Sequence, residues 1–189
     1  MEEKSEKKFK DISRLIGADQ GKRKDNDYYP TPTWAIDEMI SRVKIDGLIW
    51  EPACGDGAIS KQLIKNNYTV YSTDLYDYGY GKSGIDFLKE QIVYDNIVTN
   101  PPFGISTAFA IHGLNLVRNK LILLNKLTFL EGKVRKAKLF SQNKLERVLI
   151  FSERINFNPK VMKKTGGMLS FAWFIFDKHF DGAPSIEWI

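Results

Sequence analysis

The sequence predicts an α/β fold built on a mostly parallel sheet, for three reasons. Short runs with strand character alternate with helical patterns along residues 28–189, as they do where crossover helices join parallel strands. Some of these runs have a continuously apolar centre, such as LILL within KLILLN at 120–125, which is typical of strands covered on both faces. Apolar residues make up 43% of the 189-residue chain, enough for the core of one such domain.

The N-terminal part of the chain divides into an arm and a first helix. Residues 1–27 alternate lysine with acid and carry only a short amphipathic patch, so we expect a peripheral, flexible arm before a single domain over 28–189. The stretch TPTWAIDEMISRV at 31–43 predicts a helix that Thr31 caps and Pro32 begins. Its expected buried stripe consists of Trp34, Ile36, Met39, Ile40 and Val43.

The middle of the chain predicts alternating strands and helices. Residues 47–53 predict a buried strand that ends in the turn CGDG. The helix after this turn is expected to direct Ile59, Leu63 and Ile64 inward. Further strands are predicted over 68–74, 95–100 and 120–125, and further helices over 105–117 and 133–142.

The C-terminal part predicts a different connection. The runs 147–155 and 170–178 are long and β-rich, and the basic, glycine-containing loop between them has no helical period. Without a crossover helix, the two strands are expected to pair antiparallel at one edge of the sheet. Residues 184–189 predict a short edge strand.

Composition argues against several classes of protein. No apolar run approaches the ~18 residues of a membrane span, and the charged N-terminus has no apolar signal-peptide core. The single cysteine, Cys54, excludes a disulfide framework, and two histidines do not suffice for a zinc cluster. We therefore expect a cytoplasmic protein with neither a membrane partner nor a bound metal.

The net charge of +5 is distributed unevenly. Residues 118–164 carry 13 basic and 3 acidic side chains, a net charge of +10, whereas residues 28–117 have a net charge of −4. This segregation favours a face that binds a polyanion such as nucleic acid, and the alternative is a set of solvated, lysine-rich helices. The candidate phosphate contacts are Lys133, Arg135, Lys136, Lys138, Lys163 and Lys164.

Three polar segments follow predicted strands, at the edge where open parallel sheets bind ligands. Gly55 and Gly57, in WEPACGDG, permit a tight turn and close approach of a ligand to the backbone. Asp74 ends the second strand, where it can accept hydrogen bonds from a ribose diol. Asn100 begins the tetrapeptide NPPF, whose prolines hold the amide rigidly while Phe103 offers a flat ring for stacking. Each segment alone also fits a structural turn or cap, so the inference rests on their combination.

In combination these residues resemble the class I S-adenosylmethionine-dependent methyltransferases that act on amino nitrogens, specifically the N6-adenine methyltransferases of nucleic acids. EPACGDG is similar to the family's glycine motif, Asp74 to its ribose-binding acid, and NPPF to its catalytic tetrapeptide. YPTP at 29–32 resembles the motif that contacts the methionine end of the cofactor, and IDF at 85–87 the segment that contacts its adenine. The resemblance covers about residues 28–125. It implies a Rossmann-like fold with a seven-stranded sheet, helices on both faces and an antiparallel edge hairpin.

The resemblance further implies S-adenosylmethionine as the cofactor and methyl transfer to the exocyclic amino group of adenine, in DNA before RNA. The catalytic residues it implies are Asn100, Pro101, Pro102 and Phe103. The cofactor contacts that we expect are Tyr29, Thr31, Pro32, Glu51, Pro52, Ala53, Cys54, Gly55, Gly57, Asp74, Leu75, Asp86, Phe87 and Asn100.

Two other functions fit the same residues. The tetrapeptide also suits the side-chain amide of glutamine in proteins, although the segregated charge favours nucleic acid. A non-catalytic module that binds the cofactor or nucleic acid would keep the fold without turnover. The chain departs from many sequence-specific DNA members in leaving no room for a large target-recognition domain, and in this it resembles small, stand-alone, phage-like members.

Overall fold

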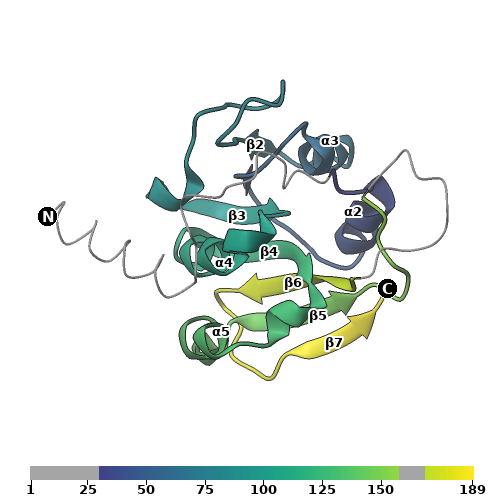
Figure 1. The fold of residues 1–189 in the computed structure, drawn as a ribbon, viewed down its shortest axis with the longest axis vertical. Coiled ribbons are helices and arrows are strands. Elements are labelled where there is room, and N and C mark those ends of the chain that lie inside the picture. Colours follow the sequence, from purple (N-terminus) through teal and green to yellow (C-terminus); the bar gives the residue numbers. More distant parts are fainter. Residues whose placement is uncertain (1–29, 158–168) are drawn as a thin grey trace, which may run out of the picture.

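The computed structural model describes residues 30–157 and 169–189 (Figure 1). The predicted arm over 1–27, Tyr29, Lys163 and Lys164 lie outside the described residues. The described helices are α2 (Thr33–Ile40), α3 (Ala58–Lys65), α4 (Ser106–Asn115) and α5 (Lys133–Lys138). The described strands are β1 (Ile49–Glu51), β2 (Val70–Ser72), β3 (Tyr94–Thr99), β4 (Val117–Lys126), β5 (Leu145–Ile150), β6 (Phe171–Asp177) and β7 (Ser185–Trp188). Short 3₁₀ helices are η1 (Phe87–Lys89), η2 (Phe103–Ile105), η3 (Leu127–Leu130) and η4 (Phe140–Gln142).

Within these ranges the strands form one seven-stranded sheet, in the order β2-β1-β3-β4-β6-β5-β7. Neighbouring strands pair in parallel except for β6, which is antiparallel to both β4 and β5. The predicted fold class is confirmed, including the antiparallel hairpin, and β7 adds the predicted short strand at the edge. The strand order reverses between β1 and β3, because β2 pairs on one side of β1 and β3 on the other. Open sheets of this kind bind ligands at such a reversal.

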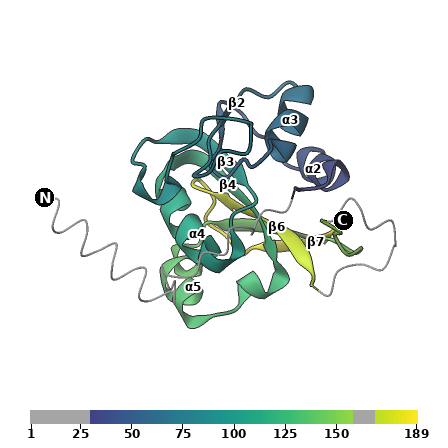
Figure 2. The same cartoon turned by 45° about the horizontal axis from the view of Figure 1, so that its top comes forward.

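Helices cover both faces of the sheet, and a separate apolar core lies between the helices and the sheet on each face (Figure 2). In β4, Ile122 and Leu124 face the core under α2 and α3, whereas Leu121 and Leu123 face the core under α4. Because successive side chains of a strand point to opposite faces, the part of a strand that is covered on both faces must be apolar at successive positions. This explains the four apolar residues at the centre of KLILLN, Leu121 to Leu124.

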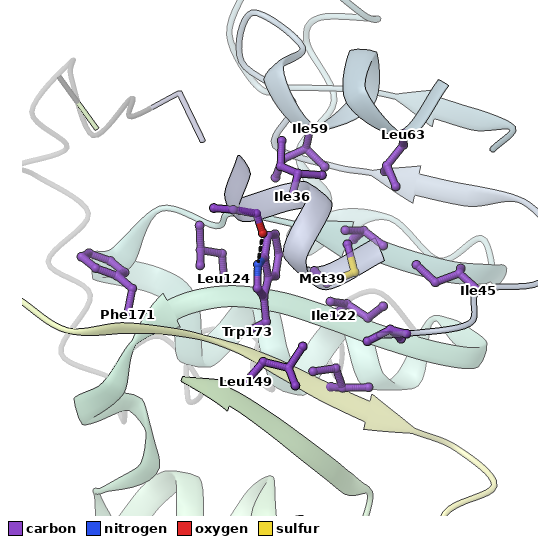
Figure 3. Packing of buried hydrophobic residues seen from close by; sticks show 14 of the residues in the cluster. Ile36, Met39, Ile45, Ile59, Leu63, Ile122, Leu124, Leu149, Phe171 and Trp173 are labelled. Atoms are coloured by element: carbon purple, nitrogen blue, oxygen red, sulfur yellow. Dashed lines mark hydrogen bonds between the residues drawn. The ribbon is translucent and has the colours of Figure 1, made fainter. Parts of the chain in front are cut away.

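Trp173 of β6 joins helix α2 to the sheet (Figure 3). Its side chain is fully buried, and its indole Nε1 donates a hydrogen bond to the carbonyl oxygen of Ala35 at 2.8 Å. Figure 3 shows Ile36 and Met39 of the same helix facing this core. A buried indole needs a partner for its N–H, so this bond fixes the position of α2, and with it the segment that precedes α2, above the sheet.

Three local predictions about helices are wrong. Helix α2 has Pro32 at its N-cap and no side-chain capping bond, because the Thr31 hydroxyl is used elsewhere. Trp34 and Ile64 are 42% and 49% exposed, since α2 and α3 have only eight residues each and their neighbours fill the narrow buried stripe. The helix predicted over 133–142 is interrupted at Leu139, whose buried side chain enters the core.

In the part of the chain that the structure describes, no helix has the length and apolar character to cross a bilayer.

Candidate active site

The turn between β1 and α3 is held by Asp74. Gly55 and Gly57 have φ values of +54° and +85°, the left-handed region that favours glycine. The Asp74 carboxylate accepts hydrogen bonds from the backbone N–H groups of Gly55 and Tyr76, both at 2.9 Å, and is 7% exposed. Asp74 therefore lies against the glycine turn, and it fixes the conformation of that turn directly.

Tyr80 covers another side of the same turn. A Cβ atom on Gly57 would lie 2.4 Å from the Tyr80 ring, so the ring packs directly against the glycine. The Lys61 ammonium lies 4.9 Å from the centre of this ring and donates to the Asp56 carbonyl oxygen at 2.6 Å. Sequence reasoning missed Tyr80, because it lies in a loop without periodicity and far from Gly57 along the chain.

Glu51 is a buried carboxyl at the end of β1. It is 1% exposed, and its Oε2 accepts hydrogen bonds from the backbone N–H of Ser60, at 2.8 Å, and from the Ser60 hydroxyl. Burial raises the pKa of Glu51 to about 8, and the negative charges of Asp74 and Asp56 add to the rise, while the Ser60 hydrogen bonds oppose it. Near neutral pH this carboxyl is therefore mainly protonated. Ser60 stands where a dinucleotide-binding loop would have its third glycine.

Cys54 lies beside Glu51 in the turn and is 4% exposed. Burial raises the pKa of its thiol to about 12, with the charge of Glu51 as the next cause. The thiolate is the nucleophilic form of cysteine, and it does not form near neutral pH here. Cys54 is therefore a small buried residue of the turn rather than a nucleophile.

The tetrapeptide NPPF follows β3 directly and leads into η2. The Asn100 side-chain nitrogen donates to the Thr31 hydroxyl oxygen at 3.2 Å, and Thr31 is 4% exposed. The amide nitrogen of Asn100 thus faces Thr31, and its oxygen points to the opposite side of the amide. Pro101 is buried, and Pro102 is the N-cap of η2. Thr31, predicted as a helix cap and a cofactor contact, contacts the predicted catalytic asparagine instead of capping the helix.

The glycine turn and Asn100 leave the sheet at the same edge. In the parallel pair β1 and β3, Ile49 lies opposite Asn96 and Trp50 opposite Ile97. The turn begins after Glu51, and Asn100 comes directly after β3. The structure therefore brings together the two segments that sequence analysis linked, at the point where the strand order reverses.

Phe103 packs at the same edge, on the side of the sheet that α2 covers. Its ring centroid lies 5.5 Å from that of Phe171, and the ammonium of Lys126 lies 4.8 Å from it. Lys126 is the last residue of β4. Sequence reasoning did not select this lysine, because nothing in its neighbourhood distinguishes it from the other lysines of the basic segment.

The segment expected to contact the cofactor adenine makes local contacts. The Asp86 carboxylate accepts from the backbone N–H of Leu88 at 3.2 Å and so caps η1. The Phe87 ring is 3% exposed and packs against Trp50 and Phe109, at centroid distances of 5.1 and 4.4 Å. Phe87 thus belongs to the core under α4. Of the other expected contacts, Pro52 is buried, and Ala53, Leu75 and Pro32 are half-buried.

The predicted phosphate contacts on α5 divide into two kinds. Lys133, Lys136 and Lys138 are exposed. Arg135 instead turns toward the protein, where its guanidinium donates to the Thr107 hydroxyl at 3.0 Å and lies 5.1 Å from the centre of the Phe129 ring. Arg135 therefore attaches α5 to α4, and the three lysines are the accessible charges. The described residues contain no group of three or more His, Cys, Asp or Glu side chains placed to hold a metal ion.

The fold is shared with methyltransferases of known structure. No protein-family model and no curated protein matches the sequence. The modification subunit of a candidate type I restriction enzyme from Vibrio vulnificus YJ016 is similar over 98% of this chain, with a TM-score of 0.58 and 15% identity. The match covers 50% of that subunit, so this chain spans about half its length.

Two further structures extend the comparison. A candidate RNA methyltransferase from Pyrococcus horikoshii gives a TM-score of 0.61 at 15% identity, over 89% of this chain and 96% of its own. Magnesium protoporphyrin IX methyltransferase from Synechocystis PCC 6803, solved with bound S-adenosylmethionine, gives a TM-score of 0.53 at 16% identity. The match covers 76% of this chain and 78% of that enzyme. The chain therefore has the Rossmann-like fold of class I methyltransferases.

The raised pKa of Glu51 predicts how stability depends on pH. The carboxyl stays protonated in the folded chain while it ionises in the unfolded one, so its contribution to the free energy of unfolding falls as the pH rises from about 4.5 to about 8. Glu51→Gln is neutral throughout and keeps an acceptor for Ser60. We expect the variant to gain thermal stability over the wild type progressively across this window, as measured by Tm at several pH values. Glu131→Gln, on an exposed residue, is the control, and a Tm difference independent of pH would contradict the assignment.

Proposed function

We propose that this chain is an S-adenosylmethionine-dependent methyltransferase that transfers a methyl group to the exocyclic amino group of adenine in nucleic acid, DNA before RNA. One observation carries the proposal. A glycine turn fixed by Asp74 and an asparagine amide oriented by Thr31 lie at one edge of the sheet, beside the reversal of strand order. The glycine turn suits the methyl donor, and the asparagine amide suits an amino group that accepts the methyl.

The residues around the turn suit S-adenosylmethionine. Glu51, Asp56 and Asp74 form an acidic group whose mutual repulsion helps to raise the pKa of Glu51, and a ligand with sulfonium and ammonium charges would relieve this repulsion. The N-terminal end of α3 suits the carboxylate of the same ligand. When bound, the cofactor supplies a methyl group activated by its sulfonium. Asp74 would bind the ribose diol, and Leu75 would pack against the adenine ring.

Asn100 and Pro101 would activate the acceptor. The lone pair of the adenine amino group is delocalised into the ring, so the nitrogen is a weak nucleophile. If the Asn100 side-chain oxygen and the Pro101 carbonyl oxygen accept its two protons, they draw the nitrogen toward tetrahedral geometry and stabilise the positive charge that develops on it. Thr31 supports this role, because it engages the amide nitrogen and so directs the oxygen toward the other side.

The substrate class is supported by local residues and by charge. Phe103 provides a ring on which an extruded base can stack, and the exposed lysines of α5 can follow a phosphate backbone. Two of the similar structures are a restriction-modification subunit and a candidate RNA methyltransferase. The magnesium protoporphyrin enzyme has the same fold and another substrate, so the proposal for nucleic acid rests on NPPF and the basic segment rather than on the fold.

The direct experiment measures transfer of tritium from methyl-labelled S-adenosylmethionine to DNA, ribosomal RNA and protein, side by side. The proposal predicts label in nucleic acid, recovered as N6-methyladenine after digestion. Label found in a glutamine of the protein acceptor would instead identify protein as the substrate. Retention of cofactor without any transfer would indicate a binding module.

Although Asn100 is also an expected cofactor contact, its amide is expected to affect catalysis far more than cofactor affinity. Asn100→Ala should lower kcat by about 100-fold or more, with little change in the dissociation constant of S-adenosylmethionine. Thr31→Val should lower kcat by roughly tenfold, because the amide loses the bond that orients it. Steady-state kinetics and calorimetry measure the two quantities, with Asn115→Ala on α4 as the control. An equal loss of binding and turnover in Asn100→Ala would contradict the assignment.

Asp74 is expected to govern cofactor affinity. Asp74→Ala removes both the proposed ribose contact and the hydrogen bond to Gly55, so the dissociation constant of S-adenosylmethionine should rise by roughly tenfold or more. The matched control is Asp77→Ala, because Asp77 is exposed on the same loop and accepts a hydrogen bond from the Gly79 N–H. An unchanged dissociation constant in Asp74→Ala would remove this residue from the cofactor site.

The exposed lysines of α5 are expected to contact phosphates. Replacing all three with Gln should weaken binding to an oligonucleotide and reduce its salt dependence, by about one unit of slope for each phosphate that the variant no longer binds. Fluorescence anisotropy at several salt concentrations measures the slope. A slope equal to that of the wild type would show that α5 is simply solvated. The control replaces three exposed lysines outside the basic segment, namely Lys44, Lys65 and Lys89.

A further inference from the structure

Lys126 carries a charge at the proposed acceptor site that the proposed chemistry does not use. It ends β4 and pairs with Phe171 of β6 at the same edge of the sheet as NPPF. Ile122 and Leu124, which precede it at two-residue spacing, face the core under α2, so Lys126 emerges on that side as well. Its ammonium lies 4.8 Å from the centre of the Phe103 ring.

Lys120, on the same strand and the same face, provides a comparison. It is half-buried, and its ammonium is bound by the carboxylates of Glu146, at 2.7 Å, and Asp177. Lys126 is also half-buried, but among residues 30–157 and 169–189 no carboxylate lies within ion-pairing distance of it. Its ammonium instead lies over the face of Phe103, a weaker partner for such a charge than a carboxylate. Within the described residues, the charge of Lys126 is therefore not balanced by carboxylates in the way that the charge of Lys120 is.

The chemistry of methyl transfer limits what this ammonium can contact. Transfer builds positive charge on the acceptor nitrogen, so an ammonium directed at that nitrogen would oppose the reaction. Adenine stacked on Phe103 would also compete with the ammonium for the ring. The ammonium then needs a partner that lies close by but is neither the acceptor nitrogen nor the Phe103 ring. An anion attached to the acceptor is such a partner.

We propose that Lys126 binds the phosphate of the target nucleotide once its base occupies the face of Phe103. This inference rests on the proposed function and deepens it, because it makes the acceptor a phosphate-bearing nucleotide. The side chain of glutamine has no such anion, and neither does a free nucleoside. Lys126 is then a residue that determines specificity, and its exchange between ring and phosphate links base stacking to backbone binding.

The test uses the full chain and an oligonucleotide in which the methylated adenine has been mapped. Lys126→Met should raise KM about tenfold and lower the salt slope of binding by about one unit, while the dissociation constant of S-adenosylmethionine stays unchanged and reports an intact fold. Lys126→Arg should retain most of the wild-type KM, because it keeps the charge. Lys44→Met is the matched control, since Lys44 has an 85% exposed side chain and precedes β1, away from the site.

A neutral methylphosphonate at the target nucleotide identifies the contact itself. It should raise KM for the wild type by about the same factor as Lys126→Met does, and it should add little to the effect of that substitution. The inference would be overturned if the methylphosphonate raised KM in Lys126→Met by the same factor as in the wild type. It would also be overturned if Lys126→Met had the KM and the salt slope of the wild type. In either case transfer to adenine by the wild type would continue, so the proposed function would stand. If the wild type methylated no nucleic acid, both would fail.

Discussion

The parallel pairing of β1 with β3 is the constraint on which the site depends. Parallel strands end at the same edge of a sheet, so the turn after Glu51 and the asparagine after Thr99 leave the sheet next to each other. Because β2 pairs on the other side of β1, Asp74 reaches the turn from that side. Three segments that are distant in the chain thus meet where the strand order reverses.

Hydrogen bonds give this arrangement its geometry. Asp74 holds the glycine turn, Tyr80 packs against it, and Thr31 orients the Asn100 amide. The position of Thr31 depends in turn on the packing of α2, which Trp173 attaches to the sheet through the Ala35 carbonyl. A bond in the core under α2 therefore helps to place a side chain at the edge of the sheet.

The charges of the site divide by chemistry as well as by position. Around the turn, the burial of Glu51 and the nearby Asp56 and Asp74 make negative charge costly, an environment suited to a cationic ligand. Beside NPPF the charge is positive, at Lys126, whose ammonium lies over the Phe103 ring and, within residues 30–157 and 169–189, has no carboxylate as an ion-pair partner. The acidic side chains around the turn and the lysine beside NPPF thus suit the two sides of one proposed transfer, a cationic donor and a phosphate-bearing acceptor.

The sequence by itself determined the α/β class, the strands and the two polar segments that follow β1 and β3, EPACGDG and NPPF. It could do so because alternation, continuous apolar runs and a glycine turn after a strand are local patterns. It was wrong about Trp34 and Ile64, since which sides of a two-turn helix are buried depends on what packs against it. Tertiary structure decided that Thr31 contacts Asn100, that Arg135 turns inward, that Tyr80 covers Gly57, and that Lys126 differs from Lys120. The physical reason is common to all four. Each depends on a neighbour from another part of the chain, and periodicity reports only the side on which a residue lies, not the atom that it meets there.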